Sequence, residues 1–205
     1  MNKSSAKKPI ETEIKLRVES AAKARSLLRR HGFRVVRPRV FEQNRVLDDA
    51  NGSLRTQGKL MRVRTAGDQT TCTFKGVENN GRHKRREERE FHADNPQECS
   101  AVFAALGFTE KFRYEKYRTE FARRGESGNV TLDETPIGTL MELEGPSRWI
   151  DSTAKELGFQ PSAYVLDSYG RLYEKWCEEN GVRKTNMTFR QRRRSSLKRV
   201  QTAGI

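Results

Sequence analysis

The stretch Glu11–Leu16, with the sequence ETEIKL, places two acids and a base at alternate positions near the N-terminus. Side chains two residues apart on a β-strand lie on one face, about 7 Å from each other. Such a strand would carry Glu11, Glu13 and Lys15 on one face and apolar residues such as Ile14 on the other. Because a charged row on a single strand is usually exposed to solvent, this stretch alone predicts only a strand.

The same alternation recurs along the chain, which changes its meaning. Six segments carry a charge, or a pair of charges on one face, and the positions between them are largely apolar or aromatic. We therefore predict an α+β fold in which antiparallel strands form a β-barrel or tunnel with peripheral helices, because closure of a sheet also removes its edges. After the first segment, the charged positions are Arg62 and Arg64, Lys75, Glu88 and Glu90, Lys116 and Arg118, and Glu142 and Glu144 preceded by Asp133.

Turn residues and helical periodicity divide the rest of the chain. Gly67 and Asp68 indicate a hairpin turn, and Pro96 and Gly107 bound a helix whose apolar residues at 102, 103, 105 and 106 are expected to face inward. The expected strands are 10–19, 33–47, 59–66, 70–77, 83–92, 108–123, 128–134 and 138–145, and the expected helices are 20–32, 95–107, 147–158 and 166–180, with a short helical turn at 53–58.

The excess of positive charge is concentrated at the two ends of the chain. Of the 41 bases, eight lie in residues 183–205 and three in residues 1–8, and neither end holds an acid, so 30 bases and all 27 acids lie between them. The net charge of +14 therefore belongs mostly to the termini. We expect a disordered basic leader over 1–9, one folded domain over 10–180, and a basic, disordered tail over 181–205. The tail could make nonspecific contacts with a polyanion such as a nucleic acid.

Several classes of site lack support in the sequence. The three cysteines are scattered and odd in number, which argues against a disulfide framework or a zinc site. No apolar run is long enough for a membrane span, and the N-terminus has no signal-peptide core, so a cytoplasmic protein is expected. No glycine-rich phosphate loop and no Ser-His-Asp arrangement is present.

A lumen lined by these charges would suit one kind of ligand. Converging Arg and Lys side chains repel each other unless anions are present, and guanidinium groups match phosphate oxygens. Carboxylates beside a phosphate site suit Mg²⁺ or Mn²⁺, which prefer oxygen ligands and bridge to substrate phosphates. The residues therefore predict a metal-assisted site for a polyphosphate.

In this order, the charged motifs resemble those of the CYTH superfamily, the triphosphate tunnel metalloenzymes. The passages Leu132–Gly138 and Glu142–Gly145 are similar to that family's late strands, and Asp167–Leu172 resembles the opening of its last helix. The resemblance covers about residues 10–175. It implies an eight-stranded tunnel that binds a triphosphate and a divalent metal ion, in a superfamily that includes class IV adenylate cyclases, thiamine triphosphatases and inorganic triphosphatases.

The resemblance also implies roles for individual residues. Glu11, Glu13 and Asp133 would be catalytic. The metal ligands would be Glu11, Glu13, Asp133, Glu142 and Glu144. The phosphate-binding residues would be Lys15, Arg62, Arg64, Lys75, Lys116 and Arg118, with Glu88 and Glu90 as supporting acids. Lys175 is a candidate for a basic residue that some members carry near the last helix, and the general base stays open.

Three functions remain open from the sequence. The first is a metal-dependent triphosphatase acting on inorganic triphosphate, ATP or thiamine triphosphate. The second is an adenylate cyclase that forms cyclic AMP and pyrophosphate, and the third is a noncatalytic polyphosphate- or RNA-binding module. Outside the main motifs, Lys84–Arg86 is expected to be a solvated strand end and Tyr169 a packing residue, while Asp133 could instead only initiate a turn before Pro136.

Overall fold

The computed structural model describes residues 10–79 and 81–189, and the expected basic leader at 1–9 and most of the expected tail lie outside them. Within the described part, eight strands form at nearly the expected positions. Their bounds are β1 Ile10–Val18, β2 Arg34–Asp48, β3 Leu60–Ala66, β4 Gln69–Lys75, β5 Lys84–Ala93, β6 Thr109–Ala122, β7 Asn129–Thr135 and β8 Gly138–Glu144.

The eight strands close into one antiparallel barrel, which confirms the predicted fold. Their order around the barrel is β1-β5-β4-β3-β2-β6-β7-β8, with β8 paired back to β1. β3 and β4 are joined by the predicted tight turn, in which Gly67 has a φ of 62°. A residue without a Cβ adopts this left-handed conformation readily.

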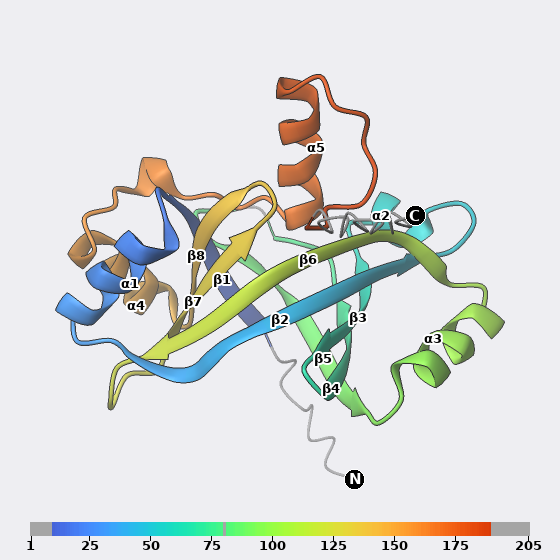
Figure 1. Cartoon of the computed structure of the whole chain (residues 1–205), viewed down its shortest axis with the longest axis horizontal. Coiled ribbons are helices and arrows are strands. Elements are labelled where there is room, and N and C mark those ends of the chain that lie inside the picture. Colours follow the sequence, from blue (N-terminus) through green and yellow to red (C-terminus); the bar gives the residue numbers. More distant parts are fainter. Residues whose placement is uncertain (1–9, 80, 190–205) are drawn as a thin grey trace, which may run out of the picture.

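Two long strands form one side of the barrel. β2 and β6 pair from Arg34 opposite Ala122 to Asp48 opposite Thr109, and they cross the molecule side by side (Figure 1). The register shifts between Arg37 and Val40, around Pro38, which has no N–H to give to a neighbouring strand.

Most apolar residues of β1 and β8 pack outward against helices and do not enter the lumen. On β1, Ile14 and Leu16 are fully buried among residues of α1 (Ala21–Arg30) and α4 (Ser147–Glu156), which lie together at one end of the barrel (Figure 1). A second cluster lies under α5 (Tyr169–Glu179) and includes Leu140 of β8. The first cluster therefore lies outside the barrel wall, which leaves the inner face of β1 free to be polar, whereas the second cluster reaches the lumen through Tyr114 and Tyr169.

The helix α3 (Pro96–Ala105) differs from its prediction. Val102 and Leu106 are 58% and 67% exposed, and no residue of this helix is fully buried. Of the residues of α3, only Cys99 and Phe103 pack against the small apolar cluster of Leu47, Val63 and Cys72. The expectation that residues 102, 103, 105 and 106 all face inward was wrong, because α3 touches the barrel along one narrow edge and projects from it (Figure 1).

The folded chain continues past the expected boundary at residue 180. After α5, Met187 is completely buried, and its backbone N–H and C=O bond to β6 at Arg113 and Glu115, both at 2.9 Å. Residues 185–189 thus pack against β6 and α5 as part of the domain, whereas residues 181–184 are exposed. The remaining helical elements are the short α2 (Ser53–Thr56) and a 3₁₀ turn at Pro161–Ala163. In the described part of the chain, no helix has the length and apolar character needed to cross a bilayer.

Candidate active site

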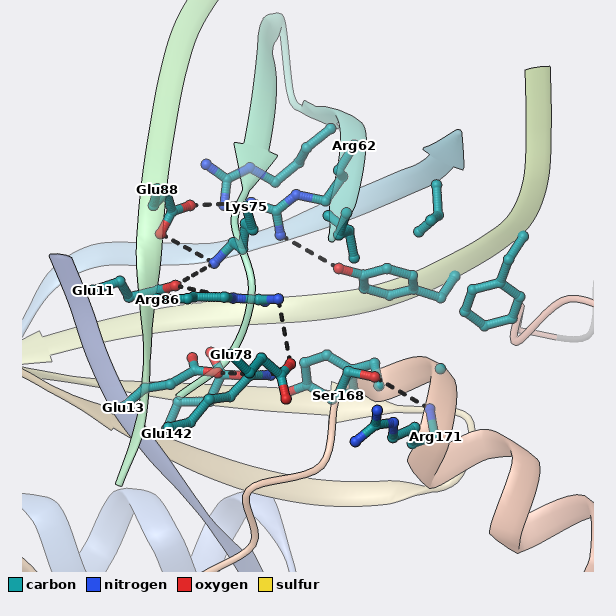
Figure 2. A pocket seen from close by; sticks show the side chains of 18 of the residues that line it. Glu11, Glu13, Arg62, Lys75, Glu78, Arg86, Glu88, Glu142, Ser168 and Arg171 are labelled. Carbon is teal, nitrogen blue, oxygen red and sulfur yellow. Dashed lines mark hydrogen bonds and ion pairs between the residues drawn. The ribbon is translucent and has the colours of Figure 1, made fainter. Parts of the chain in front are cut away.

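A cavity of about 950 Å³ fills the barrel and opens beside α5. All eight strands contribute side chains to its lining. Of the predicted site residues, all but Asp133 line this cavity: Glu11, Glu13, Lys15, Arg62, Arg64, Lys75, Glu88, Glu90, Lys116, Arg118, Glu142 and Glu144. The structure therefore brings the predicted charges from distant segments into one space (Figure 2).

The acids gather where β1 meets β8. The register places Glu13 opposite Glu144 and Lys15 opposite Glu142. The Lys15 ammonium lies 2.8 Å from Glu13 Oε1 and 3.2 Å from Glu142 Oε1. Burial alone would lower the pKa of Lys15, but the attraction of Glu13 and Glu142 outweighs burial and raises it above its usual range. Lys15 thus stays charged between these two carboxylates.

Glu144 is the exception among these acids. No base in the described ranges 10–79 and 81–189 lies within ion-pair distance of its carboxyl group. Burial, together with repulsion from Glu11, Glu13 and Glu142, raises the pKa of Glu144 to about 7. A carboxyl group that is half protonated near neutral pH can accept a proton or, once ionised, bind a cation.

On the other side of β1, strands β5, β4 and β3 carry bases paired with acids. Lys75 Nζ lies 2.6 Å from Glu11 Oε2 and 3.1 Å from Glu88 Oε2. Burial raises the pKa of Glu88 to about 8; Lys75 opposes this rise and Glu11 adds to it. Arg62 lies 3.5 Å from Glu90 and 4.0 Å from Glu88, and Figure 2 shows Arg62, Lys75 and Glu88 close together. The prediction of Glu88 and Glu90 as acids that organise bases agrees with these contacts.

Asp133 lies behind the lining. It is completely buried and accepts hydrogen bonds from Lys116 Nζ at 2.8 Å, from Arg118 Nε and Nη2 at 2.7 and 2.6 Å, and from the Tyr169 hydroxyl at 2.5 Å. Oδ2 accepts three of these hydrogen bonds and Oδ1 accepts one, and Asp133 does not line the cavity. The geometry therefore makes Asp133 the group that orients Lys116 and Arg118, and it does not place Asp133 where a metal ion in the cavity could reach it.

Tyr169 does more than pack. It is the first residue of α5, a helix capped by Ser168, whose side chain accepts from the Arg171 N–H at 3.4 Å. Its ring lies 4.9 Å from Lys116 Nζ and 5.6 Å from the ring of Tyr114, and it lines the cavity. The start of α5 therefore closes one wall of the lumen. Lys175, by contrast, is an exposed residue that pairs with Asp167 at 2.6 Å, and it does not line the cavity.

Sequence reasoning missed four residues of this site. Lys84 and Arg86 are 4% and 8% exposed and line the cavity, so their prediction as a solvated strand end was wrong. The signal was present, because they precede Glu88 and Glu90 at the same period of two. Glu42 of β2 is buried within 3.6 Å of Lys116 Nζ. Glu78 lies in the connection between β4 and β5, where no periodicity could reveal it.

The carboxylates of the lumen offer the oxygen atoms that a hard divalent cation prefers, but they do not converge on one point. Glu11, Glu13, Glu142 and Glu144 offer only oxygen, as Mg²⁺ and Mn²⁺ prefer. In the described residues, no three acidic, thiol or imidazole groups converge as a ready metal site. Three of these carboxylates, those of Glu11, Glu13 and Glu142, are ion-paired with lysine or arginine side chains. A metal ion that binds here beside Glu144 would have to displace these side chains.

Known proteins share this arrangement of strands. A structure from Vibrio parahaemolyticus, provisionally named an adenylate cyclase, superimposes with a TM-score of 0.72 at 16% identity over 82% of this chain and 99% of that one. A provisionally named adenylyl cyclase from Hippeastrum, described as having a dominant triphosphatase activity, gives a TM-score of 0.59 at 16% identity over 85% and 97% of the two chains. At these identities the likeness shows a shared fold.

Sequence comparison agrees. A protein of Methanocaldococcus jannaschii, provisionally named an adenylate cyclase, is 24% identical over 135 residues, which are 66% of this chain and 76% of that protein. The family model of the CYTH domain matches residues 9–155, from the start of the barrel into α4. This match spans most of the chain and all six charged segments, and the chain therefore belongs to the CYTH domain family.

Proposed function

We propose that this chain is an enzyme that acts on a triphosphate-bearing small molecule inside the barrel, with hydrolysis of the triphosphate as its main reaction. One observation carries the proposal: six predicted bases from four strands line the same cavity as four carboxylates of β1 and β8. Such a space is suited to a compact polyanion with a divalent cation. The six bases are Lys15, Arg62, Arg64, Lys75, Lys116 and Arg118.

Each group has a place in this proposal. The guanidinium and ammonium groups bind phosphate oxygens, and the buried Asp133 holds Lys116 and Arg118 in position. Glu11, Glu13, Glu142 and Glu144 would hold Mg²⁺ or Mn²⁺, which would neutralise charge on the phosphoryl group being transferred. Glu144, which lacks a base partner among the described residues, would be the carboxylate most available to this cation, and the general base stays open.

Adenylate cyclase activity is the second candidate, and the size of the cavity favours it. At about 950 Å³ the space lies near the upper end of the range for sites that enclose whole organic ligands. Tyr114 and Phe112 also line it on the α5 side, where an organic group attached to a triphosphate could pack. In this case a ribose hydroxyl would replace water as the nucleophile and pyrophosphate would leave.

One assay separates these functions. The purified chain is incubated with Mg²⁺ or Mn²⁺ and with inorganic triphosphate, ATP or thiamine triphosphate, and phosphate, pyrophosphate and cyclic AMP are all measured. We expect phosphate release that is lost in Glu13→Gln and kept in Glu98→Gln, which removes the same charge from the exposed start of α3. Cyclic AMP with pyrophosphate would instead identify a cyclase, and binding without any product would indicate a noncatalytic module.

A further inference from the structure

Two buried bases of the lumen have no role in the site described so far. Lys84 and Arg86 begin β5, and the register sets them directly opposite Glu13 and Glu11 of β1. Both side chains line the cavity and are more than nine-tenths buried. A buried cation is stable only with a counter-charge, so the acids around these two bases decide what they do.

The acids of β1 form only long ion pairs with these two bases. Glu13 Oε1 lies 2.8 Å from Lys15 but 3.5 Å from Lys84. Glu11 Oε2 lies 2.6 Å from Lys75 but 3.9 Å from Arg86 Nε. Each carboxylate therefore has a nearer partner, and a cation bound at Glu11 and Glu13 would draw them still further from Lys84 and Arg86.

Glu78 supplies the closest carboxylate oxygen to both bases. Its Oε1 lies 3.1 Å from Lys84 Nζ and 3.4 Å from Arg86 Nη1, so one oxygen faces two cations. Figure 2 shows Arg86 extended across the lumen between Glu11 and Glu78. In this position the Glu78 carboxylate occupies the place that an oxygen of a bound anion would take.

Glu78 does not satisfy all of the hydrogen-bond donors of Arg86. Its buried Nε has no hydrogen-bond acceptor, and Glu78 reaches only one of its terminal nitrogens. A guanidinium group that faces a phosphate donates from two nitrogens in parallel. Arg86 thus retains donor capacity that Glu78 does not use and that the several oxygens of a phosphoryl group could satisfy.

The Glu78 side chain can rotate away from these two bases. Glu78 belongs to the connection between β4 and β5, and its side chain is 26% exposed, whereas those of its two partners are 3% and 8% exposed. The backbone beside it is fixed by the hydrogen bond from Asn79 N–H to the Arg85 carbonyl at 2.9 Å. A rotation of the Glu78 side chain alone would therefore uncover both bases without disturbing β5.

We propose that Lys84 and Arg86 form a further phosphate subsite of the lumen, which the Glu78 carboxylate occupies in the free chain and from which a phosphoryl group displaces it. This inference rests on the proposed function, because it assigns the subsite to one end of the same polyphosphate. Glu78 acts as an internal competitor that weakens the binding of every anion that reaches this subsite.

Removal of the competing charge provides the test. Binding of inorganic triphosphate and of orthophosphate to the full chain is measured by calorimetry without divalent metal, for the wild type, Glu78→Gln and the control Glu98→Gln. We expect Glu78→Gln to bind both anions about five- to tenfold more tightly, as relief of one partly buried charge contact allows. Glu98→Gln should bind like the wild type, and the gain should disappear in the double variant Glu78→Gln/Arg86→Gln.

The outcomes separate this inference from the proposed function. If Glu78→Gln binds orthophosphate more tightly while no variant binds triphosphate, the proposed function fails and the subsite stands. If Glu78→Gln binds both anions no more tightly than the wild type, the subsite is overturned, whatever activity the chain shows. A gain that persists in the Arg86 double variant would also overturn it. In turnover, the subsite predicts a lower KM for Glu78→Gln at an unchanged kcat.

Discussion

Replacement of Asp133 by Asn should lower the free energy of unfolding, because Asp133 is a buried counter-charge and not a metal ligand. Asp133 is fully buried and accepts from three nitrogen atoms of Lys116 and Arg118 and from the Tyr169 hydroxyl. Removal of one partner from a buried ion pair typically costs about 3–5 kcal/mol. Glu42 lies 3.6 Å from Lys116, and Glu142 contacts Arg118, so part of the counter-charge remains.

We therefore expect Asp133→Asn to lower the free energy of unfolding by about 3 kcal/mol, near the lower end of that range. Urea denaturation at pH 7 without metal measures this loss. The matched control is Glu98→Gln, which removes a carboxylate from the exposed start of α3 and should change stability by less than about 1 kcal/mol at pH 7. A stable Asp133→Asn chain that had lost only its affinity for Mn²⁺ would refute this reasoning and make Asp133 a metal ligand.

Two further predictions concern pH and the C-terminal segment. Because the pKa of Glu144 is raised to about 7, the folded chain holds a proton that the unfolded chain releases near pH 4.5, so this group destabilises the fold increasingly as pH rises between these values. Glu144→Gln should gain up to about 3 kcal/mol over the wild type between pH 4.5 and 8, and a pH-independent difference would contradict the assignment. Met187→Ala should cost about 2–5 kcal/mol in urea denaturation because Met187 is completely buried against β6, whereas the exposed Val182→Ala should cost less than about 1 kcal/mol. A loss as small in Met187→Ala as in Val182→Ala would show that the packing of Met187 does not stabilise the fold.

The strands and most of the lumen could be predicted because both depend on a period of two. In β1, one alternation sends Glu13 inward and Ile14 outward, and the barrel wall enforces this division. The same alternation extends from Glu90 back to Lys84, so these bases could have been found too. The helix α3 shows the opposite case, because its apolar residues do not reveal how little of the barrel it touches.

The depth of each charged group could not be predicted, because depth depends on neighbours that are distant in sequence. Asp133 shares a face with Thr131, which lines the cavity, yet Tyr169 of α5 and the two bases of β6 cover it. Glu78 reaches the lumen from a connection whose path is set by the backbone bond between Asn79 and Arg85. Such contacts exist only once the barrel has closed.

The most direct measurement of the central claim is a crystal structure of the chain with a non-hydrolysable triphosphate analogue and Mn²⁺. We expect the phosphate chain inside the barrel, in contact with Lys15, Arg62 and Lys75, and an anomalous manganese peak beside Glu11 and Glu144. Triphosphate and manganese bound only outside the barrel, with the lumen charges still paired among themselves, would contradict the claim that this tunnel is the active site.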